Sequence, residues 1–334
     1  MKILTKGEIM NNFKKVGLTA LAGSLAALSA NAAEMSVSGA TLLTYTTEDA
    51  TETTGNPYGM KTNLAFTASG EVNGYTVSYY QASQDQFAGM SSARLSIDMG
   101  DMGTIAFDQG SGSGLGTIDD KTPTAAEEIW DGIDGASGLV GAAGASGVWN
   151  YIQTMGGVTF NGAIRKGSGT KNADGASSGT GGSAFDFALL ADGDTLGMEG
   201  LAMGAGYGKN TPATATSPDD KHTTVFANYS MGPVTLGAQV SKIDIGLSTT
   251  ADQNAVRWGL AFNVNDNLSV SYGEADVEFD NATTADVTES TDGMAIAYTM
   301  GSIKIAGNRN EVSNADGTSG SKDAMTEIAV SFAF

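Results

Sequence analysis

Apolar and polar residues alternate one by one along most of the chain. In one such segment Leu95 and Ile97 are apolar, whereas Ser96 and Asp98 beside them are polar. A period of two places successive side chains on opposite faces, as in a β-strand with one apolar face. Sixteen segments show this pattern and are predicted to be strands, at residues 35–45, 59–69, 75–82, 91–99, 103–108, 148–154, 157–166, 184–191, 198–207, 223–231, 233–242, 254–263, 267–275, 292–299, 302–309 and 325–334.

The connectors between these strands are alternately short and long. Short ones such as 70–74 and 155–157 contain Gly, which supplies the positive φ of tight hairpin turns. Long ones are polar, and the longest is 109–147. This order predicts an antiparallel up-and-down meander. An eight-stranded barrel would leave over half the chain in loops, and a β-helix would show one short fixed repeat.

The first residues have the features of an export signal. Lys14 and Lys15 precede an apolar stretch at 16–28, and Ala30-Asn31-Ala32 gives a small-x-small cleavage pattern. We therefore expect residues 1–32 to be a cleaved signal peptide, with Met10 as an alternative start, and residues 33–334 to form a single domain. No later stretch has 18 consecutive apolar residues, so no transmembrane helix is expected.

An exported β-protein is either soluble or an outer-membrane barrel, and a soluble β-sandwich also alternates. The polar positions here are mostly Thr, Ser, Asn, Ala and Gly, which suits a crowded wet lumen. Closure into a barrel also leaves no unpaired strand edge in lipid. The sequence thus predicts an all-β, transmembrane antiparallel β-barrel of 16 strands. Aromatic residues stand near strand ends, as in interfacial girdles, at Tyr45, Tyr58, Tyr75, Tyr151, Tyr229, Tyr298 and Phe334.

Composition and charge exclude several kinds of chemistry. The chain has no Cys and one His, so disulfides, thiol catalysis and any site with two histidines are excluded. A formal net charge of −20 argues against a nucleic-acid partner. A G-x-S-x-G match at 175–179 lies in a polar loop and has only His222 as a base, so we expect no catalytic residue. No EF-hand spacing exists and no cofactor is expected, although loop carboxylates could still bind Ca²⁺.

The signal sequence, the sixteen alternating segments and a last strand ending in Phe332-Ala333-Phe334 together resemble the Gram-negative porin family. The resemblance implies a passive diffusion channel for small hydrophilic solutes and ions. It also implies a homotrimer in the outer membrane, among lipid and lipopolysaccharide. Phe332 and Phe334 would present an assembly signal to the barrel-insertion machinery. The third long loop, 109–147, looks like the family's constriction loop, which folds into the barrel.

Charge in this loop suggests how such a channel would treat ions. The acidic residues of the loop are Asp119, Asp120, Glu127, Glu128, Asp131 and Asp134. The basic residues predicted to point from the wall into the lumen are Lys61, Arg94, Arg165, Arg257 and Lys304. Solvation alone keeps these bases off the lipid face. We expect weak cation preference, because fixed charges bias ion choice.

Other interpretations remain at this stage. The loop could be an ordinary solvated extracellular segment. The chain could be a solute-selective channel of the same fold, which would show a ladder of aromatic or Arg side chains in the lumen. A barrel enzyme would need a Ser-His or Asp-His pair near a strand end, and a purely structural or adhesive barrel would lack an inserted loop.

Overall fold

The computed structural model describes residues 34–50, 54–83, 90–144, 146–167, 182–212, 217–247 and 250–334. The predicted signal peptide, the alternative start at Met10 and the G-x-S-x-G segment lie outside the described residues. Within the described ranges, no helix has the length and apolar character needed to cross a bilayer.

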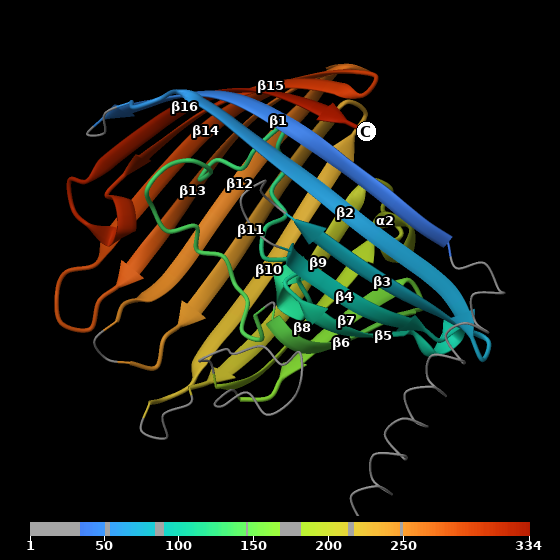
Figure 1. The fold of residues 1–334 in the computed structure, drawn as a ribbon. Helices are drawn as coiled ribbons and strands as arrows, with labels where there is room; N and C mark the ends of the chain where they lie inside the picture. The colour runs from blue at the N-terminus through green and yellow to red at the C-terminus, as the bar shows by residue number, and fades with distance from the viewer. Residues whose placement is uncertain are drawn as a thin grey trace, which may run out of the picture.

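The described residues form sixteen strands in one closed antiparallel barrel (Figure 1), which confirms the predicted fold. Each strand pairs with its neighbours in sequence, and β1 pairs with β16. Short helices are η1 (Gly100–Met102), η2 (Gly114–Thr117), α2 (Gly193–Leu196) and η3 (Ala315–Gly317). The strands are β1 (Glu34–Ala50), β2 (Tyr58–Val72), β3 (Tyr75–Ser83), β4 (Met90–Asp98), β5 (Thr104–Gln109), β6 (Ser146–Met155), β7 (Val158–Arg165), β8 (Ser183–Asp192), β9 (Leu201–Thr211), β10 (Asp220–Met231), β11 (Val234–Asp244), β12 (Asp252–Asn265), β13 (Leu268–Asp280), β14 (Val287–Met300), β15 (Ile303–Ser313) and β16 (Lys322–Ala333).

Several strands are longer than the alternation of apolar residues predicts. The predicted loop 276–291 is reduced to 281–286, because β13 and β14 continue to pair through Glu278 and Thr288. These extensions carry polar residues on their outward positions, so apolar periodicity does not detect them. Main-chain hydrogen bonding continues there regardless of side-chain polarity.

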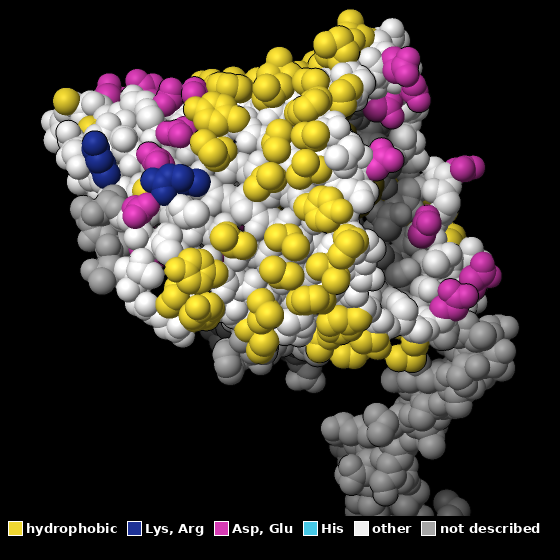
Figure 2. All heavy atoms as spheres, turned by 90° about the horizontal axis from the view of Figure 1, so that it is seen from above, with side chains coloured by type: hydrophobic (Ala, Val, Ile, Leu, Met, Phe, Trp, Pro, Cys, Tyr) yellow, Lys and Arg dark blue, Asp and Glu magenta, His cyan; other side chains and the backbone are white. Residues whose placement is uncertain are grey.

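The two faces of the barrel wall differ in character. On β12, Val256, Trp258 and Leu260 are exposed, whereas Arg257 and Gly259 between them are buried. We call the side with the exposed apolar residues the outer face and the opposite side the inner face. Figure 2 shows apolar side chains across the middle of one outer side, with acidic side chains at its edges. This distribution is that of a barrel surrounded by hydrocarbon.

A change from apolar to charged residues on the outer face falls at an aromatic pair. The rings of Trp258 and Tyr272 meet edge to face with centroids 5.7 Å apart. Both donate hydrogen bonds to Glu274, from Trp258 Nε1 at 3.3 Å and from the Tyr272 hydroxyl at 2.7 Å. An aromatic ring with its polar group turned toward a carboxylate suits the boundary between hydrocarbon and water.

The outer face can be tested with a charge at Leu260, which lies within the apolar stretch of β12. Replacing Leu260 with Lys is expected to lower the free energy of unfolding by about 1–2 kcal/mol, between the costs of a cation at the interface and at the midplane, because Leu260 lies opposite Tyr272 beside the aromatic boundary. Denaturant unfolding from lipid vesicles measures the change. Ala261→Lys is the control, because Ala261 follows directly on the inner face. Equal losses in the two variants would contradict the assignment of the faces.

Candidate functional site: segment 110–144 and the inner face

The segment 110–144, between β5 and β6, packs against the inner face (Figure 1). Leu115 and Ile118 are 0% exposed and pack with Ala188 of β8 and Phe226 of β10. Burying a Leu or Ile side chain contributes about 1.5–3 kcal/mol. The first part of the segment is therefore packed against the barrel wall and does not extend freely into solution.

Carboxylates of the wall bind the main chain of this segment. Asp186, Glu289 and Asp323 are buried on the inner faces of β8, β14 and β16. Main-chain N–H groups at a bend have no partner of their own, and carboxylates are strong acceptors for them. The bonds run from Leu115 N to Asp186 Oδ1 (3.0 Å), Ala143 N to Asp186 Oδ2 (2.7 Å), Ala136 N to Glu289 Oε2 (3.0 Å) and Asp134 N to Asp323 Oδ2 (2.7 Å).

Amide side chains bind the carbonyl groups of the same segment. Gln239 of β11 both donates and accepts, and Asn310 of β15 bridges two carbonyls. These contacts fix the path of the segment across several strands of the wall. They run from Gln239 Nε2 to Ile118 O (2.8 Å) and Asp119 O (3.0 Å), from Lys121 N to Gln239 Oε1 (2.8 Å), and from Asn310 Nδ2 to Glu128 O (3.0 Å) and Asp131 O (2.8 Å).

Arg257 lies on the inner face, as predicted, but is only 1% exposed. Its guanidinium donates to the carbonyls of Asp119 (3.2 Å) and Ser137, and lies 4.9 Å from the ring centroid of Trp130. Segment 110–144 therefore covers this base, which joins two parts of the segment to β12. Strand parity thus indicates the face of Arg257 correctly, but it does not report that a connecting segment lies on it.

Four glycines form a row on the inner face, one on each strand from β11 to β14. Gly237, Gly259, Gly273 and Gly293 are paired successively in register. A Cβ at Gly259 would lie 2.7 Å from the carbonyl oxygen of Pro123, and one at Gly293 would lie 2.9 Å from Cβ of Ile129. Glycine is therefore needed where the segment approaches the wall so closely.

The other predicted bases are on inner positions but do not gather in one place. Arg94 forms an ion pair with Asp108 at 3.1 Å and donates to the carbonyl of Gly112 at 3.1 Å, at the start of the segment. Arg165 donates to Gly182 O and Asn210 Oδ1, both at 3.3 Å. Lys61 is exposed on β2, and Lys304 of β15 pairs in register with Ser331.

Four of the predicted acidic residues are brought together. Glu128 interacts electrostatically with the like charges of Asp120, Glu127 and Asp131. Burial, and then these like charges, raise the pKa of the Glu128 carboxyl above its ordinary value.

Asp119 and Asp134 differ from these four in their surroundings. Burial also raises the pKa of Asp119, and Asp120 adds to the effect. Asp134 is exposed and is bound through its N–H to Asp323. Lys121 is the one base within 110–144, so the segment carries a strong negative charge.

The wall residues that bind this segment were not identified from the sequence. Asp186, Gln239, Glu289 and Asn310 are polar residues at inner positions, flanked by outward apolar or exposed ones. Polar residues at inner positions of the strands were the available signal, but this pattern does not show that segment 110–144 is what they bind. In the part of the chain that the structure describes, no three His, Asp or Glu side chains are grouped to hold a metal ion.

Phe332 and Phe334, predicted as an assembly signal, lie at the end of the chain on the outer face. They are 40% and 69% exposed. The main chain of Phe334 exchanges two hydrogen bonds with Gly39, both at 3.0 Å, so the last residue closes the barrel against β1. Their side chains are accessible from the outside of the barrel, and their role as an assembly signal stays a prediction.

Comparisons with known proteins agree with this architecture. The family model described as Gram-negative porin matches residues 17–301. No curated protein sequence matches the chain significantly.

Solved structures of similar fold share little sequence with this chain. A loop-deletion mutant of OmpT, an outer membrane protein of Vibrio cholerae, has a TM-score of 0.69 at 13% identity and covers 91% of this chain and 100% of its own. An anion-selective porin from Comamonas acidovorans has a TM-score of 0.65 at 14% identity, with coverages of 90% and 100%. The trimer form of Vibrio cholerae OmpT has a TM-score of 0.66 at 10% identity, with coverages of 91% and 100%.

At these identities the solved structures establish the fold alone. The family model covers most of the chain, from the region before β1 to the turn after β14. The closed barrel of sixteen strands and its apolar outer face agree with that family. The chain therefore belongs to the Gram-negative porin family and is a protein of the outer membrane.

Proposed function

We propose that the protein is a passive diffusion channel for small hydrophilic solutes and ions, without enzymatic activity. In this proposal segment 110–144 crosses the lumen and forms its narrowest passage. The main support is the set of main-chain hydrogen bonds that hold the segment on inner-face side chains from β8 to β16. A barrel of sixteen strands encloses an interior too wide to sieve solutes without such a segment.

We further propose that the channel weakly prefers cations. Segment 110–144 has six carboxylates and one Lys, and Glu128 interacts electrostatically with three of the other carboxylates. Arg257 is covered by the segment and interacts electrostatically with Asp119 and Asp120, so it offsets only part of this negative charge. The anion selectivity named for the Comamonas acidovorans porin belongs to that protein, since 14% identity carries only the fold.

The assembly proposal is a homotrimer among outer-membrane lipid and lipopolysaccharide. The trimer form of Vibrio cholerae OmpT supports it by analogy of fold. The exposed apolar outer face supplies surface both for neighbouring copies and for lipid chains. Phe332 and Phe334 are the residues that we propose the barrel-insertion machinery reads. Ca²⁺ bound by loop carboxylates would be an addition to this assembly and not a requirement of the channel.

The channel function is tested by swelling of liposomes that contain the protein, with neutral sugars of increasing size. We expect rates that fall steeply with solute size and do not saturate with concentration, because passage is by diffusion. Saturable uptake of one compound would favour a solute-selective channel of the same fold. Absence of swelling with every sugar and salt would contradict the channel itself.

The close approach of the segment to the glycine row can be tested at Gly259. Gly259→Ala places a methyl group against the Pro123 carbonyl, and such overpacking costs about 1–3 kcal/mol unless the segment moves. We expect the segment to move into the lumen and the single-channel conductance to fall. Gly307→Ala is the control, because its nearest contacts would be at 3.6 Å.

Deletion of residues 112–145 should instead raise the single-channel conductance, because it removes the segment that narrows the lumen. An unchanged conductance would place the segment outside the pore.

Ion preference is measured as the reversal potential across a salt gradient in a planar bilayer. We expect a cation preference at neutral pH that declines as the pH is lowered. Because burial raises the pKa of Asp119 and Glu128, these groups are protonated at a higher pH than exposed carboxylates, so the decline should begin above their ordinary pKa values. A clear anion preference at neutral pH would refute the proposal.

A further inference from the structure

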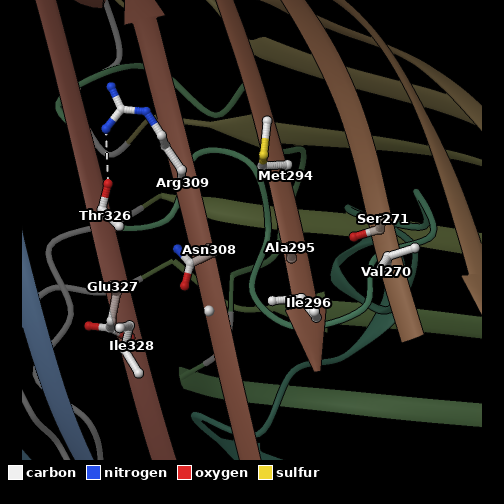
Figure 3. A pocket seen from close by; sticks show the side chains of 11 residues that line it. Val270, Ser271, Met294, Ala295, Ile296, Asn308, Arg309, Thr326, Glu327 and Ile328 are labelled. Carbon is white, nitrogen blue, oxygen red and sulfur yellow. Dashed lines mark hydrogen bonds between the residues drawn. The ribbon is translucent and has the colours of Figure 1, made fainter. Parts of the chain in front are cut away.

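Glu327 of β16 is an acidic residue in the wall that neither the family pattern nor the charge of segment 110–144 explains. Figure 3 shows it on β16 between Thr326 and Ile328, with Asn308 on the neighbouring β15. Ile328 is exposed on the outer face, so the alternation of the strand places Glu327 on the inner face. A carboxylate therefore points inward from β16, whereas the outward residues Ile328 and Phe332 of the same strand belong to the apolar surface.

A side chain of the neighbouring strand β1 holds this carboxylate in place. Thr46 Oγ1 of β1 donates a hydrogen bond to Glu327 Oε2 at 2.8 Å. On the other side, Asn308 of β15 is directly opposite in register and is buried. The side chain itself is only partly buried, so it remains accessible from the lumen. Since β16 belongs to the rigid wall, the position of this charge is fixed more firmly than that of a charge on a connecting segment.

The charges around Glu327 connect the wall with segment 110–144. Its carboxylate interacts electrostatically with the like charges of Asp131 and Glu127 and with the opposite charge of Lys61 on β2. Glu127 and Asp131 also belong to the acidic group around Glu128. Glu327 is thus a wall residue that extends the negative charge of the segment onto the barrel itself, while Lys61 partly offsets it.

We propose that Glu327 is a specificity-determining residue of the channel, which together with Glu127 and Asp131 makes the narrow passage favourable for inorganic and ammonium-bearing cations. A fixed charge in a narrow passage with low-dielectric walls raises the local concentration of counter-ions. The inference deepens the proposed function and rests on it. The inference attributes part of the cation preference to the barrel wall, where the sequence analysis identified only basic residues.

The test is the reversal potential of Glu327→Gln in a KCl gradient across a planar bilayer. We expect the ratio of cation to anion permeability to fall about two- to fourfold, because one unit charge some 6–8 Å away, in a water-like dielectric and screened by about 0.1 M salt, attracts the cation and repels the anion. Glu278→Gln is the matched control, since Glu278 is exposed on the outer face of β13. Thr46→Val removes the hydroxyl donor and keeps the charge, so most of the preference should remain.

The outcomes separate this inference from the proposed function. If the unaltered protein conducts and prefers cations, but Glu327→Gln has the same permeability ratio, Glu327 has no part in selectivity and the inference fails alone. If the unaltered protein conducts but has no cation preference, the proposed preference is wrong, and the inference that rests on it is overturned as well. Should Glu327→Gln not assemble, Lys61→Gln provides the second test. It removes the opposing charge and should raise the ratio by a similar factor, and an unchanged ratio would overturn the inference.

Discussion

Every main-chain N–H and C=O group inside a bilayer needs a partner within the protein, because hydrocarbon offers none. The pairing of β1 with β16 satisfies this constraint by closing the barrel, down to the two bonds between Gly39 and Phe334. Once the ring is closed, the outer face is free to be apolar, and almost all remaining polar groups are sorted to the inner face or to the ends. The hydrocarbon outside and the polar interior then determine which side chains each face carries.

A related requirement, that buried main-chain groups need partners, explains the chemistry of the inner face. Segment 110–144 has little regular secondary structure, so most of its main-chain groups lack partners of their own. The wall supplies them from side chains, with carboxylates such as Asp186 for N–H groups and amides such as Gln239 for carbonyls. The glycine row then lets the segment lie close enough for these bonds to form. Polar wall residues therefore act here as structural partners of a connecting segment.

How much of this could be read from the sequence depends on whether a feature is local. The sixteen strands and their faces were predictable, since each follows from alternation within about ten residues. The ends of β13 and β14 were not, because outward polar residues there interrupt the apolar pattern while pairing continues. The burial of Arg257 and the role of Glu289 depend on the path of a segment far away in the sequence, which no local pattern encodes.

The position of the segment also changes the balance of charge in the lumen. Parity alone counts five inward bases against the acidic segment, which would give a passage with charges of both signs facing each other. In the structure Arg94 is paired with Asp108 at the start of the segment, and Arg257 is buried beneath the segment, where it interacts with Asp119 and Asp120 and not with the other four carboxylates of the segment. Because Glu327 adds a negative charge on the wall beside Lys61, the acidic residues dominate where the segment meets β16. In the proposed channel, this arrangement of inward charges favours a passage with more negative than positive charge.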